Sequence, residues 1–146
     1  MNSEDTQAVS QRAVNVLLIS PFDEDHQHLR DILKHSNWQQ HEARTQRDSL
    51  EFLKENVTPV VICDSELPDG TWQEVLFRLG RMQSPPVLVV TSRMADDRLW
   101  SEVLNLGAYN VLAKPLAMKE FFHVAGLAWM SWKHRWEGKR VLARTA

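Results

Sequence analysis

Cysteine is almost absent from this sequence of 146 residues, and no apolar run is long enough to cross a bilayer. A single cysteine forms neither a disulfide nor a cysteine metal site within one chain, and Cys63, inside an apolar run, is expected to be a buried thiol. A membrane span needs roughly 20 apolar residues, and the polar residues 1–12 lack the apolar segment of a signal peptide. The sequence therefore predicts a cytoplasmic protein that does not contact a membrane.

The charge balance gives little support to a nucleic-acid binder. Lys and Arg number 17 against 19 Asp and Glu, a net charge of −2, and 43% hydrophobic with 25% charged residues is typical of one globular domain. The last fourteen residues carry a local charge of +4, so the rest of the chain carries −6. An acidic body with a short basic tail does not indicate binding to nucleic acid or to a membrane surface.

Apolar runs of strand length alternate with segments of helical period. The apolar runs 14–19, 60–63, 87–90 and 109–113 are expected strands, and 39–44, which is more polar, is a further candidate between the first two. Runs of β-branched residues without polar alternation are typical of strands that are buried on both faces of a parallel sheet. Five β-α units with right-handed crossovers predict a flavodoxin-like, doubly wound α/β fold, with five parallel strands in the order 2-1-3-4-5.

Helix ends and domain limits follow from the same pattern. Gly80 and Gly107 are expected to end the third and fourth helices in the left-handed conformation. We expect 1–12 to be a disordered lead, 13–132 to be the folded domain, and 133–146 to be an extension of the fifth helix with a basic tail.

Polar residues follow four of the predicted strands. Ligands of open parallel sheets bind at the carboxyl ends of the strands, where this chain has Ser20 and Pro21, Asp64, Thr91, and Lys114. A carboxylate can attack phosphorus, an ammonium can neutralise the transferred oxygens, and a hydroxyl can bond them. The sequence therefore predicts one crevice that is suited to phosphoryl chemistry.

Three segments resemble the receiver domains of two-component response regulators. Residues 60–70, VVICDSELPDG, resemble the third strand and the loop after the family's phosphoacceptor. Residues 87–92 resemble the fourth strand with its switch hydroxyl, and 107–108 with 114–115 resemble the fifth-strand motif, in which the Lys-Pro bond is usually cis. The resemblance covers roughly residues 15–132.

The resemblance implies a non-enzymatic phosphorelay module whose partner is a histidine kinase or another signalling protein. In it, Asp64 accepts the phosphoryl group, Thr91 is the switch hydroxyl and Lys114 contacts the phosphate. Local structural roles are the alternative for each residue: a turn start for Asp64, a helix N-cap for Thr91, and for Lys114 a static ion pair with Asp64.

The chain departs from the family where the first strand ends. Receiver domains have two adjacent acids there that hold Mg²⁺ together with the phosphoacceptor, and here those positions are Ser20 and Pro21. Because Mg²⁺ requires oxygen ligands, this loss weakens the metal site. Asp23 and Glu66 are candidate substitutes beside Asp64. The alternative is that Asp23 stabilises a helix amino terminus and that Glu66 faces water.

A second departure concerns the family's aromatic switch residue, whose position is taken by Val111, while Tyr109 lies two residues earlier. The output that depends on rotation of that ring is therefore absent or displaced. With a weakened metal site, a lasting pair between Lys114 and Asp64 would hold the domain in one state.

The apolar stripe of the last helix, expected over 117–136, is longer than one strand requires. Such a helix is about 30 Å long, against about 17 Å for a five-residue strand. Its tryptophans, with one on the fourth helix, are candidates for a docking or dimer surface formed by the fourth helix, fifth strand and fifth helix: Trp100, Trp129, Trp132 and Trp136. The alternative is that they cover the domain's own edge. The adjacent basic residues suit the carboxyl end of a helix and accompany no nucleic-acid-binding motif.

Two other interpretations stay open. One is a pseudo-receiver that docks or dimerises independently of phosphorylation. The other is a small aspartate-based phosphatase or a flavin carrier on the same fold. Residues 20–23 contain one hydroxyl and no glycine, unlike a flavin phosphate loop, and Glu66 stands where such phosphatases have an aspartate.

Overall fold

The computed structural model describes residues 13–145, with side chains up to residue 136. The lead expected over 1–12 therefore lies outside the described residues. All helix and strand bounds refer to the described part of the chain.

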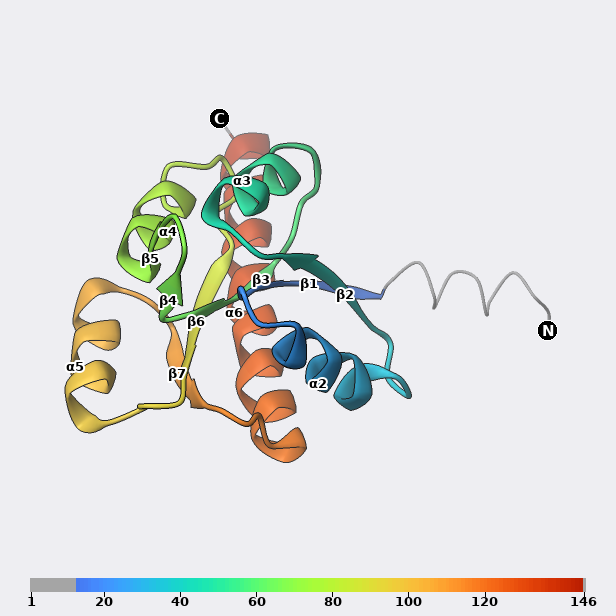
Figure 1. Ribbon diagram of the computed structural model, residues 1–146. Coiled ribbons are helices and arrows are strands. Elements are labelled where there is room, and N and C mark those ends of the chain that lie inside the picture. The colour runs from blue at the N-terminus through green and yellow to red at the C-terminus, as the bar shows by residue number, and fades with distance from the viewer. Residues whose placement is uncertain (1–12, 146) are drawn as a thin grey trace, which may run out of the picture.

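A parallel sheet of five strands forms the centre of the fold, in the order β2-β1-β3-β6-β7 (Figure 1). Its strands are β1 (Val14–Ile19), β2 (Trp38–Ala43), β3 (Val60–Asp64), β6 (Val87–Ser92) and β7 (Asn110–Ala113). A short antiparallel hairpin of β4 (Glu66–Leu67) and β5 (Gly70–Thr71) follows β3 directly. Because β4 and β5 lie outside the sheet, its order is the predicted 2-1-3-4-5, and the flavodoxin-like fold is confirmed.

Five helices cover the two faces of the sheet in the described part of the chain. They are α2 (Asp23–Leu33), α3 (Gln46–Glu55), α4 (Trp72–Leu79), α5 (Asp97–Leu106) and α6 (Met118–Thr145). Helices α2 and α6 pack on one face, and α3, α4 and α5 pack on the other (Figure 1). The expected fourth helix, fifth strand and fifth helix correspond to α5, β7 and α6.

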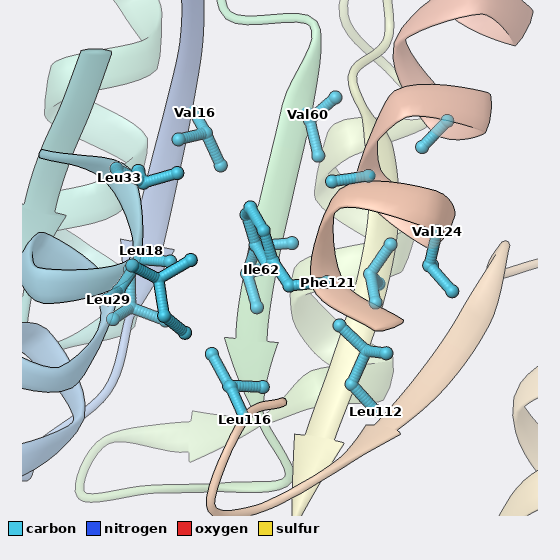
Figure 2. Close-up of a cluster of buried hydrophobic side chains, with 14 of the residues drawn as sticks. Val16, Leu18, Leu29, Leu33, Val60, Ile62, Leu112, Leu116, Phe121 and Val124 are labelled. Atoms are coloured by element: carbon cyan, nitrogen blue, oxygen red, sulfur yellow. The ribbon is translucent and has the colours of Figure 1, made fainter. Parts of the chain in front are cut away.

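Side chains alternate strictly between two apolar clusters, one on each face. In β3, Val60 and Ile62 point to the α2/α6 face with Leu29 and Phe121 (Figure 2), whereas Cys63 points to the other face. The prediction of a buried thiol is confirmed, and burial raises the pKa of Cys63 far above its usual range. This period of two also determines which face each strand-end side chain joins.

Helix α6 extends past the carboxyl limit that the sequence predicts. It has 28 residues and continues to Thr145, although the apolar stripe ends at Trp136. Residues 137–145 contain no proline and are mostly good helix formers, which explains the continuation. The helix is about 42 Å long, twice the roughly 20 Å of a six-residue strand.

The two predicted glycine caps differ. Gly107 ends α5 with φ of 99°, and its N–H donates to carbonyls of the last turn, so the left-handed cap is confirmed. The prediction for Gly80 is wrong, because its φ is −63°. There the chain stays right-handed beyond the helix, with the Arg81 N–H donating to the Arg78 carbonyl at 3.2 Å.

This difference predicts opposite effects of the same substitution. Gly107→Ala should lower the free energy of unfolding by about 1 kcal/mol, because an alanine at positive φ is strained even though no atom lies within 4 Å of its Cβ. Gly80→Ala, at an ordinary helical φ, should instead raise it by about 0.4–1 kcal/mol. Urea unfolding of both variants measures the difference, and equal effects would contradict it.

Candidate functional site

The strand-end residues lie on one face at one edge of the sheet. Asp64 is the register partner of Thr91 in the adjacent strand, and Lys114 directly follows β7. The alternation between the two clusters directs all three side chains to the α2/α6 face. The structure thus brings together the acid, the hydroxyl and the ammonium, and the Lys114-Pro115 peptide bond is cis.

Asp64 is buried, with 3% of its surface exposed. Its Oδ2 accepts a hydrogen bond from the Glu66 backbone N–H at 3.1 Å. Its Oδ1 lies 2.5 Å from Lys114 Nζ in an ion pair, although this oxygen accepts no hydrogen bond of normal geometry. Burying a carboxylate is costly unless its charge is balanced, and the Lys114 ammonium supplies that balance here.

Lys114 also contacts a second carboxylate. Its Nζ lies 2.7 Å from Oδ2 of Asp25, in the first turn of α2, and 4.8 Å from the centre of the Phe22 ring. The Lys114 side chain is 6% exposed. Two carboxylates and the face of an aromatic ring therefore enclose the ammonium.

Ser20 holds the second carboxylate in place. Its hydroxyl donates to Asp25 Oδ2 at 2.6 Å and accepts from the Phe22 backbone N–H at 3.1 Å. The Ser20 carbonyl lies 2.9 Å from Nε2 of the buried His26. The loop between β1 and α2 is thereby fixed at both of its ends.

Asp25 is a member of the site that the sequence alone did not reveal, and the contact of Ser20 with Asp25 was not predicted either. In the sequence, Asp25 is one of several acids that stabilise the amino end of a helix, and Ser20 is only the replacement of a lost acid. One signal was available for Asp25, because it lies four residues before Leu29 and thus on the buried stripe of the helix.

The two expected substitute ligands differ in position: Asp23 pairs with Arg44, whereas Glu66 lies beside Asp64. Asp23 is rotated by about 200° from Asp25 around the helix. Its Oδ1 accepts hydrogen bonds from Arg44 Nε and Nη2, at 3.0 and 2.6 Å, and these bonds hold the pKa of Asp23 below its ordinary value. The Glu66 side chain is exposed beside the Asp64 cleft and contributes its backbone N–H to Asp64.

Mg²⁺ does not fit the donor set that the chain presents in this cleft. In the described part of the chain, no group of three or more His, Cys, Asp or Glu residues is placed to hold a metal ion. The two carboxylates that do lie together, Asp25 and Asp64, both contact the Lys114 ammonium. A positive charge thus occupies the place that a divalent ion shared by them would need.

Two hollows meet at this position, and Lys114 lines both. One, of about 360 Å³, is lined by Thr91 and Asp25. The other, of about 590 Å³, is lined by Asp64 and Glu66 and opens the Asp64 carboxylate to solvent. Thr91 is itself buried, and its carbonyl accepts from the Ser65 N–H at 2.8 Å.

Neither candidate for the aromatic switch position lies beside Lys114. Val111 is buried in the apolar cluster on the face that α3, α4 and α5 cover. Tyr109 is partly buried against the cluster on the α2/α6 face. Tyr109 precedes β7, at the opposite end of that strand from the site.

The four tryptophans are not equivalent. Trp129 and Trp132 are partly buried against the α2/α6 cluster, as the domain-edge alternative expects. Trp136 stacks on Trp132 with ring centres 6.2 Å apart, and remains 36% exposed. Trp100, on α5, is 42% exposed, and no ring contact joins it to the α6 tryptophans among the described residues.

Comparison with known proteins agrees with the fold. Residues 16–125 match the response regulator receiver domain family. The chain is 31% identical over 110 residues to the aerobic respiration control sensor protein ArcB of Escherichia coli K12, a match that covers 73% of this chain and 14% of ArcB. Matching proteins from Shigella flexneri and Escherichia coli O157:H7 bear the same name.

Solved structures with this fold are also receiver domains. The signal receiver domain of an HD domain-containing protein from Pseudomonas fluorescens Pf-5 has a TM-score of 0.78 and 22% identity, over 86% of this chain and 93% of that one. The beryllofluoride-activated NtrC4 receiver domain dimer has a TM-score of 0.74 and 22% identity, over 81% and 98%.

The chain belongs to the response regulator receiver domain family and is a receiver domain of two-component signalling. Receiver domains are generally non-enzymatic modules that interact with histidine kinases and other signalling proteins, and they typically bind Mg²⁺ at the phosphorylation site. Within the described residues, no helix combines the length and the apolar character that a membrane span requires.

Asp69 holds the loop after Asp64 against helix α3. Its Oδ1 accepts from the Gln46 backbone N–H at 2.8 Å, and its Oδ2 accepts from the Arg47 N–H at 3.0 Å. These are otherwise unpaired donors at the amino end of α3. Burial raises the pKa of Asp69, but the backbone hydrogen bonds outweigh it and hold the pKa below its ordinary value.

This lowered pKa predicts a pH-dependent stability. The stabilisation by ionised Asp69 is fully present above the unfolded-state pKa, near 3.9, and is lost as the pH falls through the lower folded-state value. Asp69→Asn should therefore cost about 1 kcal/mol at pH 7, and its difference from the wild type should shrink below about pH 4. Urea unfolding between pH 7 and pH 3 measures this, and a constant difference would contradict it. Glu51→Gln, on the exposed side of α3, controls for net charge.

Proposed function

We propose that the chain accepts a phosphoryl group on Asp64 from a protein-borne phosphohistidine, and that it signals through protein contacts without a functional Mg²⁺ site. One observation supports this most directly. Asp64 ends the central strand, beneath an open cleft, with Lys114 Nζ 2.5 Å from its Oδ1. This is a nucleophile with its counter-charge already in place.

Transfer of the phosphoryl group to Asp64 needs no reactant other than the phosphohistidine donor. A carboxylate oxygen of Asp64 attacks phosphorus, the P–N bond breaks, and the imidazole nitrogen leaves with the bonding electrons. The product is an acyl phosphate. When the second ring nitrogen of the phosphohistidine is protonated, the imidazole leaves neutral and needs no further proton. Lys114 neutralises part of the phosphoryl charge, and Thr91, in the adjacent strand, is the hydroxyl available to bond it.

The ion pair between Lys114 and Asp64 affects small phosphodonors more than protein phosphodonors. A free anion such as acetyl phosphate has to approach a buried carboxylate without the metal that normally offsets their repulsion. A docked protein donor holds its phosphoryl group against the cleft. The binding free energy of the protein–protein interface offsets the repulsion between the phosphoryl group and the Asp64 carboxylate. We therefore expect small donors to fail where a protein donor succeeds.

The double pairing of Lys114 favours a second candidate, a pseudo-receiver whose docking does not depend on phosphorylation. Lys114 contacts Asp25 and Asp64 together, and both contacts are largely buried. A pair held in this way keeps the domain in one state whether or not a donor is present. Phosphorylation assays separate the two candidates.

The partner surface that we propose consists of α5, β7 and α6. Exposed apolar side chains on it are Trp100 and Leu104 of α5 with Leu127 and Met130 of α6. Tryptophan and other large apolar side chains are typical of binding hot spots. Trp136 extends the same helix, and the surface would suit a signalling protein or a second copy of the chain.

Intact-mass measurement tests the acceptor. We expect no added mass after incubation with acetyl phosphate and Mg²⁺, and the mass of one phosphoryl group after incubation with autophosphorylated histidine-kinase cores. Asp64→Ala should abolish the adduct. Asp31→Ala, which removes an exposed carboxylate of α2, should retain it.

Three results would change this proposal. Stoichiometric loading by acetyl phosphate would contradict the weakened metal site, and an adduct that persists in Asp64→Ala would assign the acceptor to another residue. If a broad panel of kinase cores gives no adduct, the phosphorylation-independent docking module becomes the better account.

A further inference from the structure

We propose that the Lys114 ammonium is the resident counter-cation of an Asp25–Asp64 carboxylate pair, and that this ammonium keeps a divalent ion out of the position between them. The proposal concerns the same cleft as the proposed phosphoryl transfer. It is measured without any phosphodonor, so the two can fail separately.

The geometry assigns the bridging position to the ammonium. Nζ lies 2.5 Å from Asp64 Oδ1 and 2.7 Å from Asp25 Oδ2, and these carboxylates come from β3 and α2. Lys114 itself follows β7. One cation therefore joins three segments that are far apart in the sequence, as a shared metal ion would.

The surroundings retain this cation rather than exchange it with solvent. The side chains of Lys114, Asp25 and Asp64 are 6%, 13% and 4% exposed, so the ion pairs are little screened by water. The Phe22 ring lies 4.8 Å from Nζ, and the Ser20 hydroxyl fixes Asp25. An ammonium tethered to the chain in this way competes at a very high effective concentration with any free ion.

Charge balance determines the effect of removing the ammonium. Asp25, Asp64 and Lys114 together carry a formal charge of −1. Without Lys114, the charge of this group is −2 on two nearby buried carboxylates that repel each other, because the other cation that lines the cleft, Arg93, is paired with Glu24. Carboxylate oxygens from two elements, with room for water in the adjoining 590 Å³ hollow, are suitable ligands for Mg²⁺ or Mn²⁺.

Lys114→Met, which keeps much of the side-chain volume, is the direct test. We expect 10 mM MgCl₂, relative to EDTA, to leave the thermal midpoint of the wild type unchanged and to raise that of Lys114→Met by about 5 °C or more, as for a site with Kd of about 0.1 mM. Titration with Mn²⁺, followed by electron paramagnetic resonance, should detect one bound ion in the variant and none in the wild type.

Matched variants identify the ligands. Lys119→Met removes an exposed lysine of α6 and should behave like the wild type toward both ions. Lys114→Met combined with Asp25→Asn should lose at least tenfold in Mn²⁺ affinity relative to Lys114→Met, because one of the two carboxylate ligands is gone. Lys114→Arg retains the positive charge and should stay indifferent to metal.

Metal binding by the wild type at millimolar concentration would overturn the proposal, as would a folded Lys114→Met that binds no ion. Unchanged Mn²⁺ affinity in the double variant would remove Asp25 from the site and overturn it equally. Should Lys114→Met fold only when Mg²⁺ is present, the proposal is supported. Should it not fold at all, Lys114→Gln takes its place in the same titration.

Discussion

The ion pair between Lys114 and two carboxylates is the interaction on which the site edge of this domain depends. It links the ends of β3 and β7 to the first turn of α2, and all three charged side chains are largely shielded from water. Charges buried in this way are costly to separate, because removal of one leaves its partners without compensation. The positions of the Asp64 carboxylate, the β1–α2 loop and the start of α2 are therefore coupled through one ammonium.

The same arrangement relates this chain to its family and separates it from the family's usual ion chemistry. The fold, the Asp64–Thr91 register and the cis Lys114-Pro115 bond are those of a receiver domain. Where receiver domains have adjacent acids after the first strand, Ser20 instead fixes Asp25 from the following helix. The second carboxylate of the cleft thus comes from α2, and its charge is balanced by Lys114.

Local patterns in the sequence predicted β1, β3, β6 and β7 well, because buried parallel strands are apolar throughout and few other structures share that pattern. The rule that ligands of open parallel sheets bind at the carboxyl ends of the strands then placed Asp64, Thr91 and Lys114 at one edge. Asp25 was not identified, because a carboxylate in the first turn of a helix already has a local explanation, and only the packing of α2 against the sheet directs it inward. The conformation of Gly80 was likewise not predictable from local sequence. Glycine after a helix often adopts the left-handed conformation, but here the right-handed turn that follows α4 determines the backbone of Gly80.

Helix α6 is anchored along its first half and continues beyond the strands to Thr145 (Figure 1). Only residues 115–117 separate Lys114 from its first turn, and Phe121 and Ala125 pack it on the core. The part of α6 nearest Lys114 is therefore a part that packs on the core. A tilt of about 5° at the packed end would displace the far end of a rod of about 42 Å by about 4 Å. Small rearrangements beside the ammonium are therefore magnified with distance along the helix, in proportion to its length.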